Sequence, residues 1–199
     1  MALQVWLPLD GSLENKGVSD LTFSVIDGSF TTVVEGGKIG EKSYYNNNGN
    51  TDQKNGEKGG IISNKTLHIG NNLSMFCWVK LEELNTAANL TGIGGMHTIK
   101  LDAGGGYSIR TGMGISVHID GTVSFSWGDG IGAFDYVAQR STAAIAIGRW
   151  HHIGFTCSTS GVDSNVIIYV DGVASGSFPL RNLCNPDDYV HLLSWSRDG

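Results

Sequence analysis

The chain has 199 residues, a length at which an all-β sandwich commonly forms one domain with a well-filled core. Its formal net charge is −6 and its few Lys and Arg residues are scattered, which argues against nucleic acid, because phosphate-backbone binding needs clustered cations. A membrane-spanning helix would need about 18 consecutive apolar residues, and a secretory signal would need a basic and an apolar region; neither pattern is visible.

The first half of the chain predicts short strands separated by glycine-rich turns. The composition, with 29 Gly and only 3 Pro, favours such an arrangement over helices. Apolar alternation predicts strands at residues 3–7, 21–26, 30–34 and 73–81, with Asp27-Gly28 as a turn between the second and the third. Residues 44–60 are too polar to bury themselves and are expected to form a long exposed loop, and residues 82–89 a short helical turn.

The second half contains two further Asp-Gly pairs, each expected to close a tight hairpin. Around Asp120-Gly121, apolar residues alternate with polar ones on both sides, which predicts a hairpin with one buried face. Asp171-Gly172 follows a strand that is apolar on both faces and is therefore expected to be central. The strands predicted here span residues 98–101, 107–110, 115–119, 123–127, 150–158, 166–170 and 189–195. An antiparallel β-sandwich formed by residues 1–199 is the natural arrangement.

The cysteines and the adjacent histidines do not match a metal site. The three cysteines cannot all pair within the chain, and free thiols are expected for Cys77, Cys157 and Cys184 because no export signal is visible. On a strand, His151 and His152 point to opposite faces, so they cannot both bind one ion. They are therefore interpreted as part of the architecture.

Several stretches, in the right order, resemble one family. Residues 7–17 (LPLDGSLENKG) are similar to its first strand and glycine loop, and residues 37–45 (GKIGEKSYY) to its next turn. Residues 73–80 (LSMFCWVK) resemble its "T-I-S-x-W-V-K" strand. The stretch from Arg149 (RWHHIGFTC), followed by residues 166–172 (VIIYVDG), resembles its "W-H-H-V-A-x-T…L-Y-V-D-G" core. The family is that of the laminin-G-like or concanavalin-A-like lectin/glucanase jelly rolls, and the resemblance spans nearly the whole chain.

The resemblance implies recognition and not catalysis. Glucanases of this superfamily typically carry Glu-x-Asp-x-x-Glu on one strand, because glycoside hydrolysis needs two carboxyl groups flanking the scissile bond. The sequence contains no such cluster, no Ser-His-Asp arrangement and no phosphate loop. The chain is therefore expected not to be an enzyme.

Carbohydrate recognition needs aromatic faces for the C–H side of a sugar and planar polar groups for its hydroxyls. Residues 126–136 (SWGDGIGAFDY) contain both, within a glycine-rich stretch. Trp127 shares the apolar face of Val123 and Phe125, so a place in the core is an open alternative for it. Ser124 would join the floor of a concave face. The candidate carbohydrate-binding residues are His118, Ser126, Trp127, Asp129, Asp135 and Tyr136.

The sequence indicates the cofactors and the biological setting less clearly than it indicates the fold. Calcium is common in the superfamily, and Asp10, Asp129 and Asp135 lie in loop-like settings, but no spacing motif fixes a site, so no cofactor is assigned. A recognition fold without an export signal is typical of virion components that are released by lysis, and the opening ALQVWLPLDG is similar to laminin-G-like proteins of bacteriophages. The resemblance thus implies a phage virion surface or tail-fibre module that binds host cell-surface polysaccharide. The alternative is a structural module that contacts other virion proteins or copies of itself.

The C-terminus departs from the family pattern. Laminin-G-like domains continue into a final strand that pairs beside the first one, whereas here the sequence stops at Gly199. Residues 3–7 would then present an unpaired edge, which is a liability for association. We expect the missing strand to be supplied by a longer gene product, a neighbouring subunit or a rearranged local segment.

Overall fold

The computed structural model describes residues 4–26, 31–46, 59–68, 72–84, 90–101, 107–128, 136–158, 165–179 and 188–193. Within these ranges every regular element is a β-strand. The described residues include no helix capable of crossing a bilayer. An all-β fold was the prediction from glycine content and apolar alternation, and it is confirmed.

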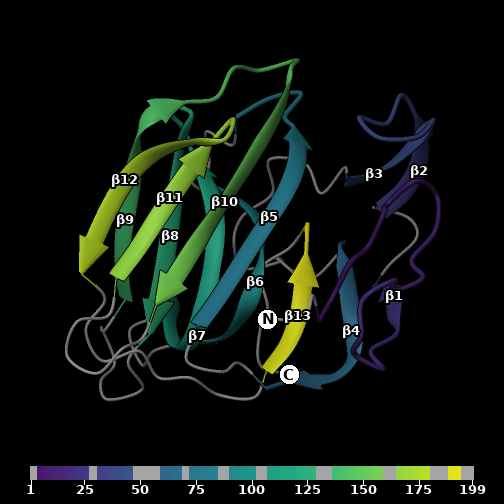
Figure 1. Ribbon diagram of the computed structural model, residues 1–199, viewed down its shortest axis with the longest axis horizontal. Coiled ribbons are helices and arrows are strands. Elements are labelled where there is room, and N and C mark those ends of the chain that lie inside the picture. The colour runs from purple at the N-terminus through teal and green to yellow at the C-terminus, as the bar shows by residue number, and fades with distance from the viewer. Residues whose placement is uncertain are drawn as a thin grey trace.

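Two antiparallel sheets and a separate ribbon make up the fold (Figure 1). The larger sheet has seven strands, in the order β1 (Phe23–Val25), β4 (Ile61–Leu67), β13 (Asp188–Leu192), β6 (Leu90–Leu101), β7 (Tyr107–His118), β8 (Thr122–Gly128) and β9 (Tyr136–Ala144). The smaller has four, in the order β12 (Val173–Pro179), β11 (Asn165–Val170), β10 (Trp150–Ser158) and β5 (Asn72–Lys80). The ribbon pairs β2 (Thr31–Glu35) with β3 (Lys42–Asn46).

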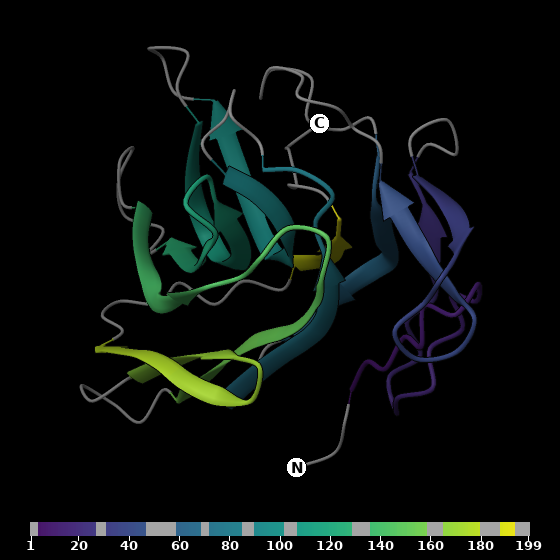
Figure 2. The same ribbon diagram turned by 90° about the horizontal axis from the view of Figure 1, so that it is seen from above.

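The hydrophobic core lies between the two sheets. Figure 2 shows β5 and β10–β12 as one layer, β6–β9 as the other, and β1–β3 to one side. Alternate residues of each strand point inward, so that Phe125 of β8 meets Phe155 of β10 with ring centroids 4.5 Å apart. At one edge the layers are joined where the Ala143 amide of β9 donates to Ser175 Oγ of β12 over 2.8 Å. The buried apolar residues of the facing strands include Val79, Ile93, Met113, Ile115, Val117, Val123, Ile153, Val166 and Ile168.

Two of the three Asp-Gly turns join paired strands. Asp120-Gly121 joins β7 to β8, and Asp171-Gly172 joins β11 to β12. Gly121 and Gly172 have φ angles of 80° and 81°. Asp171 has a φ of 52°, so this second turn has positive φ at both central residues, as a tight two-residue hairpin requires, whereas Asp120 does not have a positive φ. Asp27-Gly28 lies outside the described residues; the strands before and after it, β1 and β2, belong to different sheets and pair with β4 and β3.

The N-terminal segment differs from the prediction. Residues 4–7 form no strand; instead Lys16 N donates to Trp6 O over 2.8 Å, and Ser19 N donates to Gln4 O over 3.0 Å. Asn15 Oδ1 accepts a hydrogen bond from Trp6 N over 2.9 Å. Gln4 and Trp6 are thus bonded to residues 15–19 of the same segment and not to another strand.

Other boundaries also differ. Residues 82–84 are not helical, and residues 85–89 lie outside the described part. Strands β3, β4, β9 and β12 were not predicted. β3 lies at the start of the tract expected to be a loop, and β12 contains Gly and Ser in place of a regular apolar alternation. Both gain their order from pairing with a neighbouring strand.

His151 serves the architecture. Its Nδ1 lies 2.8 Å from Asp171 Oδ2, and the Ala146 amide donates to its Nε2 over 3.0 Å. His152 lies on the opposite face of β10 and stacks with Phe76. No group of three His, Cys, Asp or Glu side chains among the described residues could hold a metal ion.

Cys77 and Cys157 are free thiols. Burial raises the pKa of Cys77 to about 12 and that of Cys157 to about 11. Both thiols are therefore protonated and unreactive in the folded protein. Cys184 lies outside the described residues.

Candidate functional site

The outer face of the seven-stranded sheet is lined by very small residues where β6, β7 and β8 meet. One row of register partners runs from Gly92 through Ser116 and Ser124 to Arg140. The next runs from His191 through Gly95, Gly114 and Ser126 to Ala138. Glycine within a strand often marks a place where another group approaches the backbone closely. We call this the small-residue face: Gly92, Gly95, Gly114, Ser116, Ser124 and Ser126.

Three polar atoms on and beside this face are buried and have no partner among the described residues. Ser116 and Ser124 are both 0% exposed, and His118, two residues further along β7, is 8% exposed. Ser116 Oγ, Ser124 Oγ and His118 Nε2 have no hydrogen-bond partner within the part of the chain that the structure describes. Buried polar groups normally have a hydrogen-bond partner, since a buried group without one raises the free energy of the folded protein. A functional role is one explanation for a buried polar cluster of this kind.

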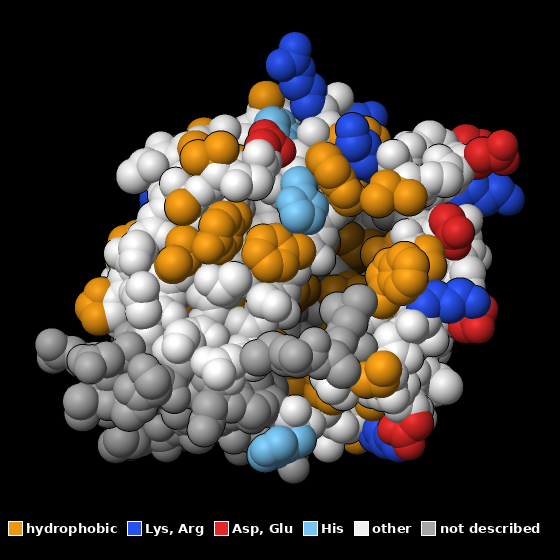
Figure 3. Space-filling view, viewed as in Figure 1, with side chains coloured by type: hydrophobic (Ala, Val, Ile, Leu, Met, Phe, Trp, Pro, Cys, Tyr) orange, Lys and Arg blue, Asp and Glu red, His pale blue; other side chains and the backbone are white. Residues whose placement is uncertain are grey.

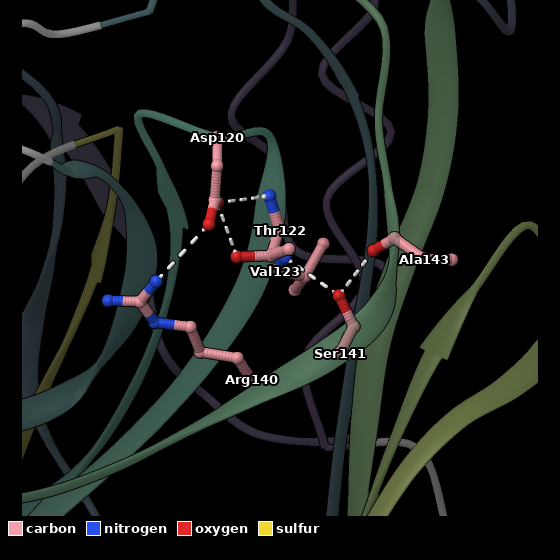
Figure 4. A network of polar contacts seen from close by, with 6 residues as sticks. All are labelled: Asp120, Thr122, Val123, Arg140, Ser141 and Ala143. Carbon is pink, nitrogen blue, oxygen red and sulfur yellow. Dashed lines mark hydrogen bonds and ion pairs between the residues drawn. The ribbon is translucent and has the colours of Figure 1, made fainter.

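Asp120 and Arg140 form the exposed rim of this face (Figure 4). Arg140 Nη1 lies 3.2 Å from Asp120 Oδ2, and Asp120 Oδ1 accepts hydrogen bonds from Thr122 Oγ1 at 2.6 Å and Thr122 N at 3.0 Å. These Thr122 bonds, followed by the Arg140 and His118 charges, lower the pKa of Asp120. Ser141 Oγ, which accepts from Val123 N over 2.9 Å, fixes the neighbouring part of β9.

His118 lies between the buried serines of the small-residue face and the exposed rim of Asp120 and Arg140. Burial, and then the positive charge of Arg140, lowers the pKa of its imidazole, while Asp120 acts in the opposite direction. The ring is therefore neutral at pH 7, with one nitrogen able to donate and one able to accept. Together with a carboxylate and a guanidinium, this provides the donors and acceptors that sugar hydroxyls need.

Trp127 does not belong to this surface. It is 3% exposed and packs in the core, with its ring centroid 5.6 Å from that of Phe125. Its register beside Met113 turns it inward, so it cannot offer a ring face to a ligand from this position. The apolar alternation left a core position open as an alternative for Trp127, and the structure places Trp127 there.

The remaining candidates are only partly described. Ser126 lies on the small-residue face and is buried. Tyr136 begins β9 opposite Gly128, but its side chain lies outside the described set, as do Asp129 and Asp135 entirely. Asp10 is described, and no calcium-holding group is found around it among the described residues.

Sequence reasoning missed Arg140 and Asp120. Asp120 was taken only as a turn residue, and Arg140 lies on β9, which was not predicted. The register that places Arg140 beside Ser124 includes an irregularity between Thr122 and Ser124, which no local pattern indicates.

Comparison with protein families is decisive for the fold. Residues 54–194 match the model of the Concanavalin A-like lectin/glucanases superfamily. The chain belongs to this superfamily. No curated protein sequence matches it.

Solved structures resemble this superfamily member at low sequence identity. Domain 4 of AbnA, a GH43 extracellular arabinanase from Geobacillus stearothermophilus in complex with arabinotriose, is similar over 96% of this chain and 82% of that one, with 19% identity and a TM-score of 0.64. A heptameric SAP-like pentraxin from Limulus polyphemus matches over 66% of this chain and 55% of that one, with 18% identity and a TM-score of 0.44. The likeness to the arabinanase domain concerns the fold alone.

Proposed function

We propose that this chain is a non-catalytic carbohydrate-recognition domain that uses the outer face of its seven-stranded sheet. The observation that supports this best is the buried cluster of Ser116, Ser124 and His118, whose polar atoms lack partners among the described residues. A sugar approaching from the rim would meet Asp120 and Arg140 first, because both are exposed. His118 stands between that rim and the floor and would take the next hydroxyl.

The acid–base chemistry at the rim favours binding over hydrolysis. A glycosidase needs one carboxyl group that holds a proton at working pH. Asp120, with its pKa lowered, is ionised there and pairs with Arg140. An ionised, paired carboxylate accepts hydrogen bonds from hydroxyls and does not protonate a leaving group.

The biological setting we propose is a phage virion surface or tail fibre, where the ligand would be a host cell-surface polysaccharide. The support is the resemblance of residues 2–11 to phage laminin-G-like proteins. The similarity to an arabinanase domain solved with arabinotriose makes arabinan a useful additional probe.

Affinity electrophoresis tests the proposal. Native gels containing Gram-positive cell-wall polysaccharide or arabinan should retard the wild-type protein. Arg140→Ala should weaken binding by about 1.5–3 kcal/mol, the usual worth of a hydrogen bond to a charged group. Its thermal stability should change little, since the ion pair of Arg140 with Asp120 is exposed. The matched control is Arg149→Ala, an exposed arginine in the turn before β10.

Two results would refute the proposal. One is equal binding by the Arg140→Ala and Arg149→Ala variants. The other is release of reducing sugar from a bound polysaccharide, which would make the chain a glycanase. Absence of glycan binding, together with association with virion proteins, would favour the alternative of an assembly module.

A further inference from the structure

An aromatic surface lies on the outer face of the four-stranded sheet, on the opposite side of the sandwich from the small-residue face. Figure 3 shows hydrophobic side chains gathered with a histidine over the region of β5, β10 and β11. We define the aromatic platform as Phe76 and Trp78 of β5, His152 of β10 and Tyr169 of β11. Trp78 is the register partner of His152, and Gly154 links Phe76 to Tyr169 in the adjacent row.

The rings of the platform hold one another in place. The centroids of Phe76 and His152 are 5.5 Å apart with their planes within 14°, and Trp78 lies 5.0 Å from His152. Tyr169 lies 5.7 Å from Phe76. A Cβ on Gly154 would come within 2.3 Å of Phe76 Cδ1, so only glycine lets the Phe76 ring settle over β10. The platform is therefore ordered before any ligand arrives, which reduces the entropy cost of binding.

Its charged neighbours are already engaged. Lys38 Nζ lies 4.7 Å from the ring centroid of Trp78, a cation–π contact. Asp171 accepts hydrogen bonds from His151 and from the His152 amide. Neither charge requires an oppositely charged ligand.

The rest of this sheet face is uncharged and hydroxyl-rich toward the other end of the strands. Asn165 Nδ2 lies 3.1 Å from Ser177 Oγ, and the further polar side chains of the same face are Asn72, Ser74, Thr156 and Ser158. Phe76 and Trp78 remain 43% and 38% exposed beside them. Exposed aromatic rings next to short amides and hydroxyls are the combination that sugars need, with ring faces for C–H groups and polar atoms for hydroxyls.

We propose that the aromatic platform binds a linear, uncharged polysaccharide, whose sugar rings lie over Phe76, His152 and Trp78 while its hydroxyls reach the polar half of the face. The short polar side chains leave the path along the sheet open for an extended chain. This inference shares its ligand class with the proposed function but concerns the other sheet, so the two sites can fail separately.

The test uses affinity electrophoresis with soluble linear β-1,3-glucan, β-1,4-xylan and arabinan. We expect wild-type protein to be retarded by at least one of these polymers, and Phe76→Ala and Trp78→Ala to bind it about ten-fold or more weakly, as loss of an aromatic anchor typically produces. Phe76→Tyr, which keeps the ring, should bind as the wild type does. Val173→Ala is the matched control, because Val173 is 68% exposed on β12 of the same sheet. Circular dichroism melting of each variant separates lost binding from lost folding.

The possible outcomes either overturn the inference or separate it from the proposed function. No retardation of the wild-type protein in any of the three gels would overturn it. Loss of binding in Arg140→Ala with unchanged binding in both platform variants would also overturn it, and would leave the proposed function standing. Loss in the platform variants with unchanged binding in Arg140→Ala would instead support the platform and refute the site on the seven-stranded sheet. A dimer of the wild-type protein in analytical ultracentrifugation that Trp78→Ala dissociates would identify the platform as a self-association surface.

Discussion

Trp127 fills the space between the two sheets, where its indole packs beside the ring of Phe125. Replacing it by Ala would leave a cavity and remove most of its buried apolar area. We expect Trp127→Ala to lower the free energy of unfolding by about 3–5 kcal/mol, measured by urea denaturation. Trp6→Ala is the control, because Trp6 is 55% exposed and its loss should change stability by about 0.5 kcal/mol or less. A Trp127→Ala variant as stable as Trp6→Ala would contradict the core assignment.

Asp171 links the end of β10 to the hairpin turn after β11. The hydrogen bond from His151, and then that from the His152 amide, lowers the pKa of its carboxyl group. A lowered pKa stabilises the folded protein above the unfolded-state value of about 3.9, and this stabilisation is lost as the pH falls through the folded-state pKa. Melting temperatures of wild type and Asp171→Asn between pH 7 and pH 2 should therefore converge in acid. Asn tolerates the positive φ of this turn, so a pH-independent gap would show that the charge is not involved.

At the level of single residues, sequence predicted the direction of side chains better than their contacts. Alternation put Ser124 and Ser126 on the face opposite Val123, as the structure has it. The same alternation left Trp127 ambiguous, because a glycine-rich segment with two acids follows it. It could not predict that Asp120 meets Arg140, since that contact depends on the pairing of β8 with β9.

The two Asp-Gly hairpins look alike in sequence but differ in their surroundings. Gly121 and Gly172 share nearly the same positive φ, yet a Cβ on Gly121 would lie 2.7 Å from Ile145 O, whereas a Cβ on Gly172 would meet nothing within 4 Å. Gly172→Ala should thus cost only the backbone strain, about 1–2 kcal/mol. Gly121→Ala should cost more, because a backbone carbonyl must also move. Urea unfolding of the two variants checks this order, and equal losses would contradict it.

Among the elements, the strands with strong apolar content were predictable and the weak ones were not. β5, β10 and β11 carry inward-facing apolar residues at every second position and were predicted within one residue. β9 and β12 contain mostly small or polar residues, and their strand form depends on hydrogen bonding to β8 and β11. Such tertiary stabilisation leaves no periodic pattern in the sequence.

At the scale of the whole molecule, the two-layer antiparallel arrangement was predictable, because the alternation requires two sheets that share one core. The order of the strands within each sheet was not predictable. Local patterns do not indicate that β4 and β6 are separated by β13, which is distant in sequence from both. The face that gathers Ser116, Ser124 and Arg140 is built from the consecutive strands β7, β8 and β9, and only part of it was predicted because β9 carries no apolar alternation.

The central place of β13 has a consequence for the order of folding during synthesis. Each of β7 to β12 can pair with a strand already made, but β4 borders β13, which is synthesised more than 100 residues later. β1, whose partner is β4, depends on the same event. We therefore expect the nascent chain to complete the larger part of the sandwich first, and β1 and β4 to join the sheet only once residues 188–192 have left the ribosome.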